Sequence, residues 1–270
     1  MRTSLLCPCG MIVVLATLNF APTAQADLVA MWHFDESPGG SVATDSGGTH
    51  PGMLAGDAAF VSGGISGNAL SVSRTGNGLV DMGDNFRFGT GDFTVEAWVK
   101  TTDSAADSLF VGKHRSTIQA GYFLTINYID GWEPNKVTFW INGYTDYVNS
   151  TCNVNDGGWH QVVGVYHAEG TTDIYVDGAL ENVETSTPVA ANDAHFLVGG
   201  IDYSGVASGA FTGLIDDVQL YDNALAPTDV EYLFQNPGQA VPEPATLSLL
   251  AIGGLAILRR RSGQVLSRRK

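Results

Sequence analysis

The central part of this chain is short of basic residues. The whole chain has 13 Lys and Arg, but Arg2 and six residues after position 258 account for seven of them, so residues 27–240 keep six. The same stretch holds 27 of the 28 acidic residues, which gives it a net charge of −21 against −15 for the whole chain. A surface this acidic repels nucleic acid and attracts divalent cations and basic partners. We therefore exclude nucleic acid as a ligand.

Cysteine is equally scarce. The chain has three, and Cys7 and Cys9 lie in an N-terminal apolar segment, which leaves Cys152 alone in the rest. Without its leader the chain cannot form an intramolecular disulfide. We expect Cys152 to be a buried, unreactive thiol, with an intermolecular bridge as the alternative. The sequence also lacks the Cys/His clusters that bind zinc.

Apolar segments at both ends indicate export. Residues 1–26 have a basic start, an apolar stretch and a small-x-small cleavage site, so they predict a secretory signal peptide. Near the other end, a Pro-Glu-Pro tripeptide at 242–244 precedes an uncharged apolar run at 245–258 and a basic tail at 259–270. The run would rise only ~21 Å as a helix, against a hydrocarbon core of roughly 30 Å. It predicts a short transmembrane segment whose arginines stay in the cytoplasm.

This C-terminal order resembles the PEP-CTERM sorting signal of bacterial exported proteins. The resemblance implies a linker at 237–244, a transmembrane segment at 245–258 and a cytoplasmic tail at 259–270. It also implies an exosortase-type processing enzyme as a partner. We therefore expect a protein that is exported, tethered to the inner membrane by its C-terminal segment, and then passed to the cell surface, the extracellular matrix or its exopolysaccharide.

Between the two signals the sequence predicts strands. Runs of β-branched and aromatic residues alternate with Gly, Asn and Asp turns, which favours a sandwich of two antiparallel sheets. Residues 93–100 form the clearest strand, because their apolar side chains recur with period two. We also predict a hairpin of 69–72 with 78–82, and a short helix over 227–234 with a proline at its start. Residues 235–242 predict a short flexible stalk.

Several of these strands and turns resemble the laminin-G-like, concanavalin A-like jelly-roll domains of bacterial surface proteins. The resemblance covers residues 27–236 and is carried, in order, by 30–36 (AMWHFDE), 45–48 (DSGG), 67–70 (GNAL), 93–99 (FTVEAWV), 158–162 (GWHQV), 174–178 (IYVDG) and 213–221 (GLIDDVQLY). It implies an all-β concanavalin A-like jelly roll. Because this fold hosts lectins, adhesion modules and hydrolases alike, it does not decide the function.

The resemblance further implies a calcium ion that ties the first strand to the last. Carried over by position, the ligands are Asp35, Asn68 and either Asp216 or Asp217, which offer the oxygen atoms that calcium prefers. Neighbouring residues on a strand point to opposite faces, so we expect only one of the two adjacent aspartates to be a direct ligand. The alternative is that both bond to loop amides or cap the strand.

Aromatic residues in polar, loop-like sequence predict a ligand-binding surface. Trp132, Tyr144, Tyr147 and Tyr203 are surrounded by Asn and Asp. Sugars stack on such rings while neighbouring amides and carboxylates bind their hydroxyl groups. The same rings could instead anchor loops onto the edges of the sandwich.

The sequence gives no catalytic constellation. A glycoside hydrolase needs two carboxylates that flank the scissile bond, and the Glu-x-Asp-x-x-Glu type of run that related glucanases carry is missing. Glu96 stands alone on its strand, and the resemblance implies that Trp159 and His160 lie mid-strand in the core as structural residues. We therefore predict a non-catalytic module that binds polysaccharide or an extracellular matrix component. A purely structural acidic matrix protein is the main alternative, and a glycoside hydrolase of the same fold is a weaker one.

Overall fold

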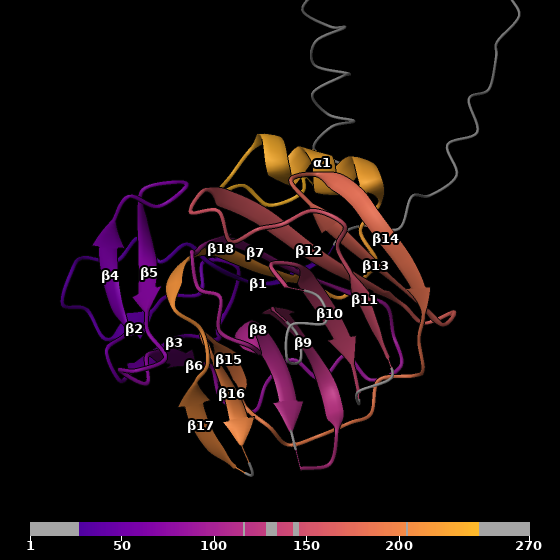
Figure 1. Cartoon of the computed structure of the whole chain (residues 1–270), viewed down its shortest axis with the longest axis horizontal. Coiled ribbons are helices and arrows are strands. Elements are labelled where there is room, and N and C mark those ends of the chain that lie inside the picture. The colour runs from indigo at the N-terminus through magenta and orange to yellow at the C-terminus, as the bar shows by residue number, and fades with distance from the viewer. Residues whose placement is uncertain (1–26, 116, 128–133, 143–145, 204, 243–270) are drawn as a thin grey trace, which may run out of the picture.

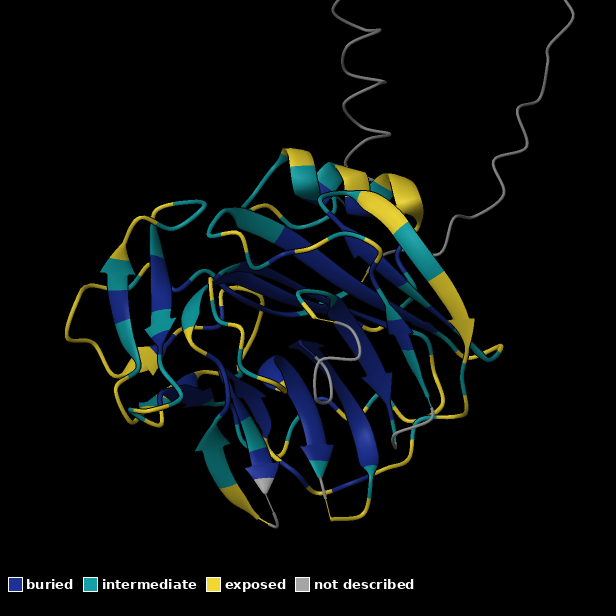
Figure 2. Ribbon diagram, in the orientation of Figure 1, coloured by how far each residue is buried: buried dark blue, intermediate teal, exposed yellow. Residues whose placement is uncertain are grey.

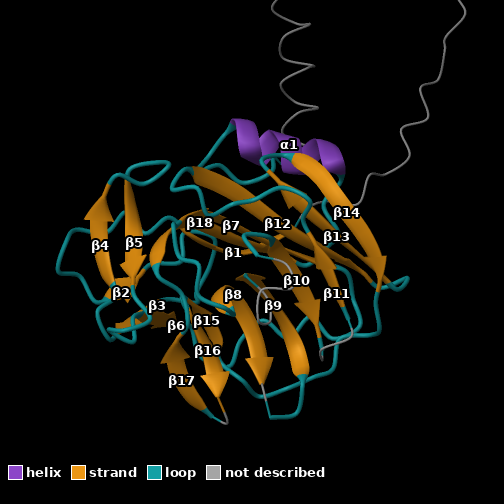
Figure 3. Cartoon of the chain, viewed as in Figure 1, coloured by secondary structure: helices purple, strands orange, loops and turns teal. Residues whose placement is uncertain are grey.

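The computed structural model of the chain describes residues 27–242 except for a few short gaps. The gaps are residue 116, 128–133, 143–145 and 204. The described residues form two sheets that face each other across a common core, as Figures 1 and 3 show. The predicted all-β jelly roll of two antiparallel sheets is confirmed. The predicted signal peptide and transmembrane segment lie outside the described residues.

The first sheet runs in the order β14-β13-β12-β7-β18-β5-β4, and β1 also pairs with β18. Its strands are β1 (Leu28–Trp32), β4 (Ala59–Ser62), β5 (Asn68–Val72), β7 (Phe93–Lys100), β12 (Trp159–His167), β13 (Thr171–Val176), β14 (Ala179–Thr185) and β18 (Gly213–Tyr221). The first and last strands therefore lie side by side, and β14 forms one edge of the sheet.

The second sheet runs in the order β11-β10-β9-β8-β15-β6-β3-β2, with the β16–β17 hairpin joined to β8. Its strands are β2 (Val42–Ala43), β3 (Gly52–Ala55), β6 (Leu79–Asp81), β8 (Ser108–Arg115), β9 (Ala120–Ile126), β10 (Val137–Ile141), β11 (Tyr147–Asn149), β15 (Phe196–Val198), β16 (Gly200–Tyr203) and β17 (Val206–Gly209). The edge strand β11 contacts β14, so the two sheets meet along these edges.

The core fills the space between the sheets (Figure 2). Phe93, Val95 and Val99 of β7 point into it, as their alternation predicts, and each is at most 1% exposed. Burying a side chain of this size stabilises the fold by about 1.5–3 kcal/mol. Gly164 of β12 lies under the ring of Phe139, where a Cβ atom would come within 2.6 Å of the ring. The packing therefore requires glycine at this position.

The predicted hairpin of 69–72 with 78–82 is wrong. Strand β5 pairs within the first sheet and β6 within the second, so the turn between them crosses from one sheet to the other. The carboxylate of Asp57 holds this turn: it accepts a hydrogen bond from the backbone N of Ser73, and it lies where Cβ atoms on Gly76 and Gly78 would be. A local apolar pattern does not show which sheet a strand joins.

Helix α1 (Pro227–Gln235) covers the outer face of the first sheet. Val230 and Leu233 pack on β12, β13 and β18, and the predicted helix is confirmed. Within the described residues, no helix has the length and apolarity to cross a bilayer.

The chain after α1 is held against β18. The side chain of Gln219 donates to the carbonyl of Gln239 (3.1 Å), and the backbone N of Val241 donates to the hydroxyl of Tyr221 (3.2 Å). Much of the stretch that we predicted to be a flexible stalk is therefore docked on the first sheet, because its backbone groups find partners there.

Candidate functional site

The four predicted calcium ligands lie close to one another beside the first sheet. Asp35 follows β1, Asn68 begins β5, and both aspartates of β18 are fully buried. The backbone N of Asn68 donates to Asp35 (2.7 Å), and that of Ile65 donates to Asp216 (2.8 Å). The loop between β4 and β5 is thereby tied both to the end of the first strand and to the last strand.

Both adjacent aspartates face away from the core. Strand β18 carries a bulge between Asp216 and Gln219, so two of its residues face one residue of β7, and Asp217 adopts a φ of 43°. Asp216 consequently reaches the Ile65 amide while Asp217 reaches the ring of His33 (2.8 Å), and the residues on either side of the pair belong to the core. The expectation that they point to opposite faces is wrong, because it assumed a regular strand.

Burial makes these carboxylates costly to ionise. It raises the pKa of Asp216 to about 8, and the charge of Asp217 adds to the shift. Burial also raises the pKa of Asp217, although the hydrogen bond from His33 opposes it. A divalent cation beside the pair would favour the charged forms of both groups.

The carboxylates are already engaged by amides, which is the alternative that the sequence left open. Asp216 accepts hydrogen bonds at both oxygens, from Ile65 and from the backbone N of Asp217. Across residues 27–242, apart from the gaps, no three His, Cys, Asp or Glu side chains are grouped so that they could hold a metal. A calcium ion would therefore need backbone or amide oxygens as well, and Asp217 offers a buried Oδ2 that has no hydrogen bond within the described part of the chain.

Of the predicted sugar-binding aromatics, Tyr147 is the one whose side chain the structure describes. Trp132 and Tyr144 lie outside the described residues. Tyr203 ends β16, where only its backbone is described. Tyr147 begins β11 at the edge of the second sheet.

Tyr147 lines an open groove of about 410 Å³ where β11 meets β14. The other lining residues are Lys136, Asn149, Ser150, Thr151, Asn182 and Glu184. The tyrosine ring lies against Trp140 (5.2 Å between centroids), which itself stacks on Phe123 (5.5 Å). These contacts across three strands fix the ring at the groove wall.

The polar side chains of the groove are also held in place. Oδ1 of Asn149 accepts from the hydroxyl of Thr138 (2.7 Å), and Oδ1 of Asn182 accepts from the backbone N of Val183 (2.9 Å). A flat ring beside oriented amides is an arrangement suited to binding a sugar. Sequence reasoning found Tyr147 but missed Asn182 and its strand, because β14 is largely exposed and shows no core-facing pattern.

Glu181 fastens the loop that closes one side of the groove. Its Oε2 accepts from the backbone N of Thr151 and of Cys152, both at 3.0 Å. Although burial opposes it, these hydrogen bonds hold the pKa of Glu181 below its ordinary value. Cys152 is half-buried, and burial, aided by the charge of Glu181, raises the pKa of its thiol to about 11. At neutral pH such a thiol stays protonated and is a poor nucleophile, although it is half-buried rather than buried as expected.

The placement of Trp159 and His160 in the core is wrong. Both are half-buried at the start of β12. The ring of His160 lies between Asp177 (2.9 Å) and Asp156 (3.1 Å), and the hydrogen bond to Asp177 raises its pKa. The histidine therefore ties the Asp177 turn to the start of β12.

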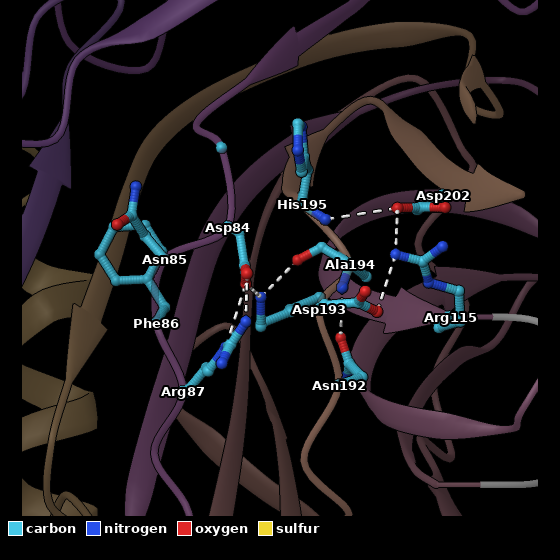
Figure 4. Close-up of polar contacts among 12 residues, drawn as sticks. Asp84, Asn85, Phe86, Arg87, Arg115, Asn192, Asp193, Ala194, His195 and Asp202 are labelled. Carbon is cyan, nitrogen blue, oxygen red and sulfur yellow. Dashed lines mark hydrogen bonds and ion pairs between the residues drawn. The ribbon is translucent and has the colours of Figure 1, made fainter. Parts of the chain in front are cut away.

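Sequence reasoning also missed a polar cluster on β8, which Figure 4 shows. Lys113 is 2% exposed and bonds to Asp84 (2.6 Å) and to the carbonyl of Ala194. Arg115 pairs with Asp193 (2.9 Å) and with Asp202 (3.5 Å). These carboxylates neutralise the two cations, so the cluster fastens loops to β8 and leaves little positive charge for a ligand.

The two-sheet fold agrees with a comparison of the sequence with protein-family models. Residues 74–231 match the model of the concanavalin A-like lectin/glucanases superfamily, and this match covers more than half of the chain. The chain belongs to this superfamily. In this member, residues 240–262 also match the PEP-CTERM protein-sorting motif. Comparison with curated proteins finds no match.

Solved structures share the fold of this superfamily member at low identity. Domain 4 of AbnA, a GH43 extracellular arabinanase from Geobacillus stearothermophilus in complex with arabinotriose, has 21% identity and a TM-score of 0.62 over 78% of this chain and 100% of that domain. A Trypanosoma rangeli sialidase mutant has 19% identity and a TM-score of 0.57, over 77% of this chain and 32% of the sialidase. The receptor binding domain of botulinum neurotoxin type G has 14% identity and a TM-score of 0.55, over 77% and 51%. The chain therefore spans about a third of the length of the sialidase and about half of the length of the neurotoxin domain.

Proposed function

We propose that this protein is an exported, non-catalytic module that binds polysaccharide or another component of the extracellular matrix. The observation that carries the proposal is the groove between β11 and β14, where the ring of Tyr147 stands beside the oriented amides of Asn149 and Asn182. The arabinotriose complex of the structurally similar AbnA domain supports a sugar ligand by analogy of fold.

The sorting motif supports the destination. We propose that an exosortase-type enzyme processes the chain, that residues 245–258 hold it in the membrane beforehand, and that the domain then reaches the cell surface or the exopolysaccharide. Mass spectrometry of the C-terminal peptide of the mature protein should show cleavage beside the Pro-Glu-Pro motif. A mature protein that keeps its basic tail would contradict this part of the proposal.

A glycan array tests the binding function. The purified full-length chain in mild detergent should bind one class of glycan, and Tyr147→Ala should weaken that binding by about tenfold, because one stacked ring contributes up to about 1.5 kcal/mol. Tyr147→Phe keeps the ring and serves as the matched control, since stacking survives. Absence of binding to every glycan, with the fold intact, refutes the proposal.

A structural calcium ion is the second part of the proposal. Asp35, Asn68, Asp216 and Asp217 lie beside the β4–β5 loop and the first and last strands, and a cation among them would offset the burial that raises the pKa of both β18 aspartates. A metal that binds only the folded state raises the melting temperature. EDTA should therefore lower the melting temperature of the protein, and Asp217→Asn should abolish this effect. An unchanged melting temperature in EDTA excludes the site.

The net charge of −21 over residues 27–240 favours one other function, that of a structural acidic matrix protein bridged by calcium. Calcium-dependent self-association without glycan binding would identify it. Light scattering on the same samples as the array separates the two functions.

A further inference from the structure

The groove between β11 and β14 offers hydrogen-bond donors to a ligand. The amide oxygens of Asn149 and Asn182 are both used within the protein, by Thr138 and by the backbone N of Val183. An asparagine whose oxygen is engaged presents its NH₂ group to a ligand, and which end of the amide is which follows from these partners. Asn149 lines the groove from the second sheet and Asn182 from the first, and the NH₂ group of neither forms a hydrogen bond within the described part of the chain.

Lys136 adds a positive charge at the same place. Its ammonium group bonds to the carbonyl of Thr151 and, within the described part of the chain, to no carboxylate. This distinguishes it from Arg87, Lys113 and Arg115, each of which is paired with an aspartate. Glu184 also lines the groove but forms no ion pair with Lys136. The charge of Lys136 thus remains available to a ligand.

These two observations together point to an anionic ligand. Three donors, one of them charged, match the carboxylate of a uronic acid, because charge-assisted hydrogen bonds to a carboxylate are stronger than those to a neutral hydroxyl. The domain as a whole repels acidic polymers at a distance, since residues 27–240 carry a net charge of −21. A local cation is therefore the feature that binding of such a polymer requires.

We propose that the groove binds an acidic polysaccharide. A sugar carboxylate accepts hydrogen bonds from Lys136 and from the amides of Asn149 and Asn182, while a sugar ring stacks on Tyr147. This inference rests on the proposed function and specifies its class of ligand.

The test compares each acidic polymer with its own neutral form. Calorimetry on the full-length chain in mild detergent measures affinity for polygalacturonate and for alginate, each beside its methyl-esterified form, which has the same sugars without the charge. At least one acid should bind about tenfold more tightly than its ester, the difference expected for a charge-assisted contact that is partly exposed. Lys136→Gln should remove this preference, so that the variant binds the acid and its ester with similar affinity.

Lys100→Gln is the matched control. Lys100 is also half-buried and lines a different pocket, so its replacement makes the same change of charge without touching the groove. It should leave the preference intact. Asn182→Asp, which replaces the free NH₂ group with an acceptor of the same shape, should weaken binding of the acid by about tenfold or more.

The outcomes separate this inference from the proposed function. Equal affinity for acid and ester, with sensitivity to Tyr147→Ala, leaves a sugar-binding groove but overturns the acidic ligand. If the Lys136→Gln variant still binds the acid more tightly than the ester, the inference of an acidic ligand is overturned as well. Absence of binding to any glycan on the array overturns the proposed function and the inference with it. Circular dichroism and melting curves confirm that each variant is folded.

Discussion

Replacing Glu96 with glutamine should make the protein more stable at alkaline pH. Glu96 lies on the outer face of β7 and is 0% exposed. Its Oε1 accepts from the side chain of Gln161 (2.7 Å), and its Oε2 is buried without a hydrogen bond in the described part of the chain. Burial raises the pKa of Glu96 to about 8, against the effect of Gln161, and the charge of Asp217 raises it further. The folded protein therefore holds this carboxyl in its neutral form at pH 7.

The size of the effect follows from the two pKa values. The ordinary value for glutamate is 4.5 and the folded value is about 8. Between them the folded state keeps a proton that the unfolded chain has lost, so the free energy of unfolding falls as the pH rises through this window. At 1.36 kcal/mol per unit, the total loss is about 5 kcal/mol. Glutamine has nearly the same shape and stays neutral, and its NH₂ group can donate to the unpartnered Oε1 of Gln161. Glu96→Gln should therefore remove this pH-dependent fall in the free energy of unfolding.

Urea unfolding measured at several pH values, at one fixed calcium concentration, tests this. The variant and the wild type should have similar free energies of unfolding near pH 4.5. As the pH rises, the difference should grow until the variant is more stable by about 5 kcal/mol above pH 8. Glu169→Gln, in the exposed turn after β12, is the matched control and should follow the wild type. If Glu96→Gln lowers stability equally at every pH, the carboxyl is not held neutral and the reasoning fails.

Three further predictions follow from the packing and the pKa shifts. Gly164→Ala should cost about 1–3 kcal/mol in urea unfolding, because the new methyl group clashes with Phe139. Tyr221→Phe removes the hydrogen bond from Val241, so the C-terminal segment should be cleaved faster in limited proteolysis, at a cost of about 1 kcal/mol. The hydrogen bond with Asp217 raises the pKa of His33, so this contact stabilises the fold fully below pH 6.5, and the stabilisation is lost as the pH rises through the raised pKa. His33→Ala should therefore remove this pH-dependent step from the free energy of unfolding.

Local patterns predicted the elements whose side chains face the core. Strand β7 and helix α1 were found at nearly their observed bounds, because alternation with period two and a proline at the helix start are local signals. Strand β14 was missed because it lies at an edge and is largely exposed. The hairpin of β5 with β6 failed because the choice of sheet depends on long-range pairing.

The residues of the candidate site were also predictable from the sequence only in part. Tyr147 was predicted from its polar surroundings, and Asp35 and Asn68 from a resemblance that places them by position. The partners of Tyr147 were out of reach, since Asn182 enters the groove only through the pairing of β14 with β13. Asp216 and Asp217 both face away from the core because β18 has a bulge and Asp217 has a positive φ. Two adjacent aspartates in a sequence do not reveal either feature.

The most direct test of the account is the affinity of the full-length chain for the glycan that it binds best on the array. Calorimetry in the presence of calcium should give a dissociation constant that Tyr147→Ala raises by about tenfold and Tyr147→Phe leaves nearly unchanged. Chromatography of the same samples should show the glycan uncleaved. Binding that Tyr147→Ala does not weaken, or turnover of the polysaccharide, would contradict a non-catalytic binding groove between β11 and β14.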